Sequence, residues 1–87
     1  YVFRLQVAKF NKKVSTKKFN ELTKIEGLIP MEDKEGNMRY LTGEFKDYEK
    51  AKEFKHQMIE KYNLKDCFLI AEKNGDFKPV KEVLNMH

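Results

Sequence analysis

The segment Arg4-Leu5-Gln6-Val7-Ala8-Lys9-Phe10 recurs, 35 positions later, as Arg39-Tyr40-Leu41-Thr42-Gly43-Glu44-Phe45. Each copy alternates apolar and polar residues and then ends in a small residue, a polar residue and a phenylalanine. Such alternation is typical of a half-buried strand, because successive side chains point to opposite faces. The repeat therefore predicts two related halves whose first strands lie side by side at the centre of one sheet. Chance similarity between two amphipathic strands is the alternative explanation.

The residues around the two copies predict further strands. We expect strands over residues 2–9, 28–33, 38–45 and 67–73. Pro30 suggests that the second of these lies at an edge, because proline cannot donate a ladder hydrogen bond. Lys34-Glu35-Gly36-Asn37 supplies turn residues between the second and third strands, which should form a hairpin. Asn74-Gly75 is a strong tight-turn signal at the end of the last strand.

Three helices are expected between and after these strands. The first is capped by Ser15 or Thr16 and reaches about residue 24, with Gly27 closing it. The second begins after Asp47, covers about residues 48–61 and ends at Asn63. Its apolar stripe has spacings of three, four and four, and consists of Ala51, Phe54, Met58 and Tyr62. A short terminal helix is expected from Pro79 onward.

This order predicts one α+β domain over residues 1–87 with an RNP-like βαββαβ fold. A four-stranded antiparallel sheet would carry two helices on one face, with a short C-terminal helix added. The other face would be left to solvent or to a ligand. Because the chain opens directly on a strand, we expect a domain excised from a larger protein, with any export signal or anchor lying outside it.

The composition fits a globular domain with a small core and a heavily charged surface. Of 87 residues, 40% are hydrophobic and 37% are charged, and the formal net charge is +4. A mild positive excess fits an anionic polymer as partner, but it is also common in proteins without one. No run of about 18 apolar residues occurs, so we expect the domain itself not to span a membrane.

The sequence shows no catalytic or metal-binding pattern. His56 lies on the polar side of the second helix and His87 is the last residue, so neither has a partner at ligand spacing. Cys67, the only cysteine, lies in an apolar run, where we expect a small buried hydrophobe rather than a reactive thiol. The carboxylates lie among lysines, which is typical of a solvated surface. We therefore expect a protein that is not an enzyme and has neither metal nor cofactor.

Alternation predicts which side chains project from the sheet face without helices. The expected set combines guanidinium groups, an amide, an apolar platform and two small residues that let a ligand approach: Arg4, Gln6, Ala8, Arg39, Leu41, Gly43, Phe68 and Ile70. Amides and guanidinium groups bond the hydroxyl and acetamido oxygens of sugars, and apolar side chains pack on the ring faces. Alternatively, Arg4, Gln6 and Arg39 are ordinary solvated strand residues, and Phe68 and Ile70 belong to a strand buried on both faces.

Several motifs occur in a recognisable order: Phe3 and Leu5-Gln6-Val7-Ala8 with Phe10, Tyr40 to Phe45, Asp47 to Ala51, Asp66 to Ala71, and Asn74-Gly75 to Leu84. Together they resemble the SPOR domain, in the variant found in Bacteroidetes-type bacteria. The resemblance implies a non-catalytic module that binds peptidoglycan glycan strands lacking stem peptides, typically in the periplasm or cell envelope of a Gram-negative bacterium at division sites. The sequence departs from the family at Ala8, where glycine is usual, and in its lysine-rich first helix.

Two other functions remain open at this point. RNA-recognition domains of the expected topology stack bases on aromatic residues of the two central strands. Phe3 and Tyr40 are aromatic, but alternation places them on the helix side, and a register slip of one residue would reverse this. The second alternative is a protein-interaction or dimerisation module that uses the same sheet face.

Overall fold

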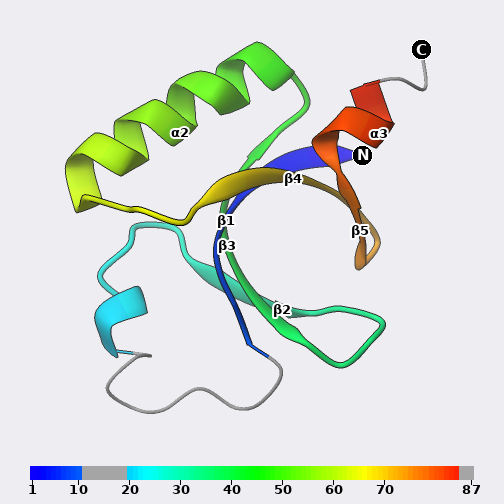
Figure 1. Cartoon of the computed structure of the whole chain (residues 1–87), viewed down its shortest axis with the longest axis horizontal. Coiled ribbons are helices and arrows are strands. Elements are labelled where there is room, and N and C mark those ends of the chain that lie inside the picture. Colours follow the sequence, from blue (N-terminus) through cyan, green and yellow to red (C-terminus); the bar gives the residue numbers. More distant parts are fainter. Residues whose placement is uncertain (11–19, 85–87) are drawn as a thin grey trace.

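The computed structural model describes residues 1–10 and 20–84, which form a five-stranded antiparallel sheet in the order β2-β3-β1-β4-β5 (Figure 1). The predicted α+β class is confirmed, whereas the predicted count of four strands and the βαββαβ order are not. Beyond residues 20–22, which are the described end of the first helix, the elements are β1 (Val2–Phe10), β2 (Ile29–Glu32), β3 (Met38–Phe45), α2 (Tyr48–Tyr62), β4 (Phe68–Lys73), β5 (Asp76–Pro79) and α3 (Val80–Leu84). The expected caps Ser15 and Thr16 lie outside the described residues.

The additional strand β5 follows from the turn at Asn74-Gly75. Both residues have positive φ, 52° and 83°, as a two-residue hairpin turn of type I′ requires. The chain therefore reverses and pairs antiparallel with β4, from Lys73 opposite Asp76 to Ile70 opposite Pro79. Sequence reasoning recognised the turn but not that a strand followed it.

The two copies of the repeated motif are neighbours, as predicted, because β1 pairs with β3 over most of its length. Two bulges interrupt the pairing. One adds a residue to β3 opposite Arg4, where Gly43 has φ of +80°, and the other adds Val7 to β1 between Gln6 and Ala8. Each bulge changes which side chains face a given side of the sheet.

The helices cover the convex side of the sheet (Figure 1). One buried cluster joins β1 and β3 to the first helix, its following turn and α2, and consists of Leu5, Leu22, Ile25, Tyr40 and Met58. A second joins the sheet to α2 and α3, and consists of Phe3, Ala51, Ala71 and Val83. Phe10 packs edge-on against Tyr40 at 5.9 Å between ring centroids, and Phe45 packs against Phe54 at 5.0 Å. The closing phenylalanines of both motifs are therefore partly buried and pack against the core on the helix side.

Helix α2 forms where its capping residues predict it. The Asp47 carboxylate accepts hydrogen bonds from the backbone N–H groups of Glu49 and Lys50, at 2.8 and 3.4 Å. Asn63 ends the helix in the left-handed conformation, with φ of 54°. Ala51 and Met58 of its apolar stripe are buried against the sheet.

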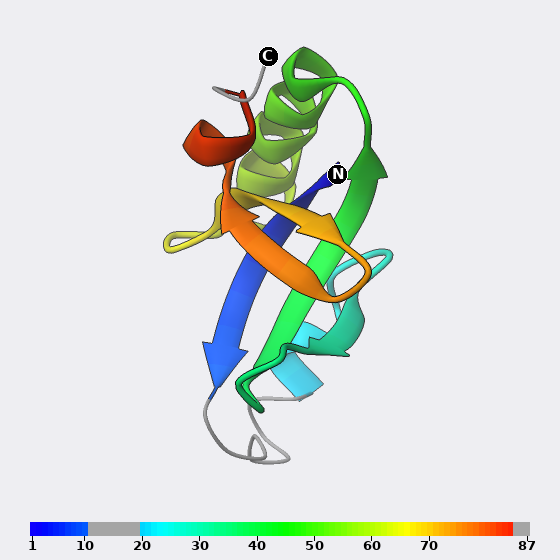
Figure 2. The ribbon, with the colours of Figure 1, turned by 90° about the vertical axis from the view of Figure 1, so that its right-hand side faces the viewer.

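The sheet curls strongly away from the helices that cover its convex side. The Arg39 guanidinium of β3 lies 4.6 Å from the centre of the Phe77 ring of β5, although two strands separate β3 from β5 in the sheet. Figure 2 shows the β4–β5 hairpin crossing in front of β1 and β3. The face without helices is therefore a concave trough that β5 partly covers.

Candidate functional site on the concave face

The concave face brings together most of the predicted site residues. Strand pairing places Arg4 beside Ile70 and Gln6 between Leu41 and Phe68. The Arg39 side chain reaches the same face, where its Nη1 donates to Gln6 Oε1 at 2.7 Å. Predicted alternation holds for six of the eight residues, namely Arg4, Gln6, Arg39, Leu41, Phe68 and Ile70.

The predicted placement of Ala8 and Gly43 as small residues toward this face is wrong. The bulge at Val7 shifts the alternation, so Ala8 pairs with Tyr40 and packs against the helix-side cluster. At Gly43 the helix side leaves no room for a side chain, because an added Cβ would lie 2.7 Å from Cε2 of Phe54 and 2.9 Å from Cε2 of Phe45. Only the backbone carbonyl of Gly43 serves the concave face.

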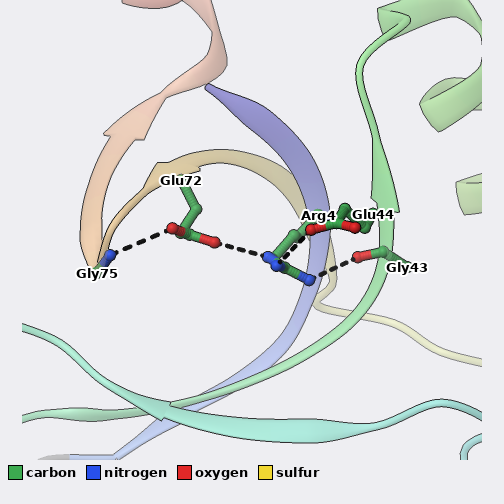
Figure 3. A network of polar contacts seen from close by, with 5 residues as sticks. All are labelled: Arg4, Gly43, Glu44, Glu72 and Gly75. Carbon is green, nitrogen blue, oxygen red and sulfur yellow. Dashed lines mark hydrogen bonds and ion pairs between the residues drawn. The ribbon is translucent and has the colours of Figure 1, made fainter.

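Arg4 organises the end of the trough nearest the β4–β5 turn (Figure 3). Its Nε donates to Glu72 Oε1 at 2.9 Å, its Nη1 to the Gly43 carbonyl at 3.2 Å, and its Nη2 to Glu44 Oε1 at 3.0 Å. Glu72 Oε2 in turn accepts from the backbone N–H of Gly75 at 3.2 Å. The guanidinium is thereby fixed between β3 and β4.

Arg39 organises the other end through Asp33. Arg39 Nε donates to Asp33 Oδ2 at 3.0 Å, and Asp33 Oδ1 accepts from the backbone N–H groups of Glu35 and Asn37. Burial alone would raise the pKa of Asp33, but these N–H groups and the Arg39 guanidinium outweigh it, so its pKa lies below the ordinary value. Asp33 therefore stays ionised and holds Arg39 against Gln6.

The concave face is not the bare platform that was expected. Gln6, Leu41 and Ile70 have exposed fractions of 4%, 0% and 5%, because the curl of the sheet and β5 cover them. Phe68, at 46%, is the member of the predicted set that is well exposed. A ligand would meet Phe68 and the outer atoms of the two arginines before it reached the floor of the trough.

Sequence reasoning missed four residues of this site: Asp33, Glu44, Glu72 and Phe77. Glu72 follows Ile70 by two positions on β4, so alternation alone would have placed it on the same face. Phe77 could be placed only if the fifth strand was known, and Glu44 could be placed only if the bulge in β3 was known. Asp33 was assigned to the end of a strand, and nothing in the sequence indicated that its carboxylate binds the following turn.

An open cavity of about 480 Å³ lies over Arg4. Its walls include Glu44, Glu72, Lys73 and Met31 of β2. A second hollow, of about 450 Å³, is lined by Gln6 and Phe68 and also by Ala8, Phe10 and Leu22 of the helix side. The cavity over Arg4 therefore opens on the concave face, whereas the second hollow extends to the helix side of β1.

The other residues considered at the sequence level lie away from this face. His56 is exposed on α2, and His87 is outside the described residues. Cys67 is half-buried against the helix-side cluster, and burial raises the pKa of its thiol although Lys55 acts in the opposite direction. Within residues 1–10 and 20–84, no group of three His, Cys, Asp or Glu side chains is placed to hold a metal. Among the same residues, no helix has the length and apolarity needed to cross a membrane.

Comparison of the chain with protein-family models, with curated proteins and with solved structures finds no match. Support for a function therefore comes from the concave face itself and from the motifs in the sequence.

Proposed function

We propose that this chain is a SPOR-type module that binds peptidoglycan glycan strands, stripped of stem peptides, on its concave face. It would target a larger protein to the cell wall or septum, in the periplasm or cell envelope of a Gram-negative bacterium, without catalysing a reaction. The observation that carries this proposal is the composition of the trough. It holds two fixed guanidinium groups and an amide beside apolar side chains, and carboxylates offset its positive charges.

Such a surface suits a polymer of sugars. Hydroxyl and acetamido groups both donate and accept hydrogen bonds, and the trough offers donors on Arg4 and Arg39 and acceptors on their carboxylate partners. The exposed Phe68 ring, half in solvent at the trough edge, provides an apolar surface for the C–H face of a pyranose. Because the polar groups are already held by neighbours, little ordering is needed on binding.

The same features disfavour single-stranded nucleic acid. Phe3 and Tyr40, the aromatic residues of the two central strands, are buried in the helix-side clusters with exposed fractions of 5% each. Base stacking on the central strands needs aromatics on the opposite face. Arg4 and Arg39 are each paired with carboxylates, which would repel a phosphate backbone.

Retention on purified sacculi, before and after an amidase removes the stem peptides, tests the proposal. We expect stronger retention on the stripped material, and loss of it for the double variant Gln6→Ala/Arg39→Ala. A matched control removes an amide and a cation from the exposed side of α2, as Gln57→Ala/Lys50→Ala, and should bind as the original protein does.

Removing Arg39 leaves the buried Asp33 without its cation, so the double variant requires a thermal melt as a folding check. Phe68→Ala provides an independent arm, because this exposed side chain can be removed with little effect on the core. We expect at least about threefold weaker retention for it, since ring stacking contributes of the order of 1 kcal/mol. Equal, weak retention of the original protein on both materials would refute glycan-strand recognition.

A further inference from the structure

The three partners of Arg4 differ greatly in how firmly they are held. Glu72 has a side-chain exposed fraction of 7% and is bound both by Arg4 and by the Gly75 N–H. The Gly43 carbonyl belongs to the backbone of β3. Glu44 has a side-chain exposed fraction of 63%, and Arg4 is the partner of its carboxylate in the described structure. Glu44 is therefore the partner that can leave at low cost, because an exposed ion pair contributes little.

The cavity over Arg4 is lined by Arg4 and Glu44, whose contact is drawn in Figure 3. A guanidinium has five N–H groups, and the three contacts of Arg4 use three of them. With Glu44 turned into solvent, Arg4 and Lys73 would face the single buried carboxylate of Glu72. The cavity would then hold one uncompensated positive charge and a free edge of the guanidinium, which matches a single carboxylate.

We propose that Glu44 occupies the position of a ligand carboxylate, and that this carboxylate is the one exposed on a glycan strand when its stem peptide is removed. The inference rests on the proposed glycan binding and specifies how the site would recognise stripped strands. The stem peptide is joined by an amide to the lactyl ether of muramic acid. Hydrolysis of that amide breaks the C–N bond and leaves a carboxylate on the sugar and an amine on the peptide.

An intact strand bears a neutral amide at this position, and a stripped strand bears an anion. Exchange of Glu44 for the ligand carboxylate replaces one Arg4 ion pair by another, so the charge of the guanidinium stays compensated. An amide in the same place would leave Arg4 with a weaker acceptor and would gain nothing from displacing Glu44. Arg4 is thus a specificity-determining residue in this proposal, and Glu44 is its competitor.

The experiment uses stripped glycan strands, one portion of which has its carboxylates capped as methylamides. Binding is measured by NMR titration, with the Arg4 Nε–H signal as the local probe. We expect the original protein to bind free-carboxylate strands about tenfold more tightly than capped strands, as for a charge-assisted hydrogen bond. Glu44→Gln should tighten binding of the free-carboxylate strands by about twofold to fivefold and leave the capped strands unchanged.

Glu49→Gln is the matched control, because it removes an exposed carboxylate that is paired with Lys52 on α2, away from the concave face. It should change neither affinity. The double variant Arg4→Gln/Glu72→Gln removes the guanidinium together with its buried partner, so no buried charge is stranded, and should abolish the preference for free carboxylates.

The outcomes separate the two proposals. Equal binding of free and capped strands would overturn the carboxylate exchange while glycan binding stands. An unchanged or weaker affinity of Glu44→Gln for the free-carboxylate strands would overturn the competitor role of Glu44. Failure of the original protein to bind either material would overturn the proposed function and this inference with it.

Discussion

Gly43 shows how one residue serves both faces of the sheet. Its positive φ forms the bulge that aims its carbonyl at Arg4, and its missing side chain leaves room for the rings of Phe45 and Phe54. The close packing of Phe54 against the strand thus depends on the same glycine that completes the Arg4 network. A residue that sequence reasoning assigned to the ligand is required by the core.

Gly43→Ala should therefore destabilise the fold in two ways. An alanine at this φ costs about 1–2 kcal/mol of backbone strain, and displacing the two rings costs about 1–3 kcal/mol more. Gly36→Ala is the matched control, because Gly36 has a similar φ of +84° but no atom within 4 Å of an added Cβ. Urea unfolding of both variants measures the difference, and equal losses would contradict the packing role.

At the scale of elements, the β2–β3 hairpin depends on the Asp33 carboxylate. It binds two N–H groups of the turn that follows and the Arg39 side chain of the partner strand. The turn, the edge strand and the trough thus share one ionised group. The Asn74-Gly75 turn at the other edge has a carboxylate partner too, because Glu72 Oε2 accepts from the Gly75 N–H, but its reversal also follows from the positive φ of both turn residues.

The lowered pKa of Asp33 predicts an acid-sensitive hairpin. The contribution of Asp33 to stability is fully present above the pKa that its carboxyl has in the unfolded chain, about 3.9. It is lost as the pH falls through the lower pKa that this carboxyl has in the folded protein. Asp33→Asn should therefore flatten the decline of urea midpoints between about pH 5 and pH 2. Glu35→Gln, which removes an exposed carboxylate from the same turn, should leave the decline unchanged; an identical decline in Asp33→Asn would refute the assignment.

For the whole molecule, the contact between Arg39 and Phe77 joins strands that are not neighbours in the sheet. It links the two sides of the curled sheet, and Leu41 and Ile70 on the concave face are buried. The polar network and the curl therefore stabilise each other.

Phe77→Ala should loosen β5 across the trough. We expect a loss of about 1–2 kcal/mol from lost packing and the lost cation–π contact, with faster amide exchange in β5 than in β1. Phe77→Leu keeps apolar bulk but lacks the aromatic ring, so its stability should lie between those of the original protein and of Phe77→Ala. Unchanged exchange in β5 of Phe77→Ala would show that another contact holds the curl.

Much of the fold was predictable because local signals were strong. Asp47, Asn63 and the apolar stripe fixed α2, and the repeated motif placed β1 beside β3. The fifth strand was missed because four residues, Asp76 to Pro79, carry too little periodicity to distinguish a strand from a helix start. For the site, alternation failed at Ala8 because a bulge is a tertiary feature that shifts the period without a sequence mark. The burial of Gln6 and Ile70 depends on curvature, which no single strand encodes.

The position of β1 has a consequence for how the chain folds. This strand comes first in the sequence and lies in the middle of the sheet, so its two edges are filled by β3 and by β4, which lie further along the chain. The β2–β3 hairpin can close early over a short loop, whereas the second edge of β1 is paired only when residues 68–73 have reached it. We expect slow, all-or-none folding dominated by distant pairings, in which losing the C-terminal hairpin exposes the central strand to association with other chains.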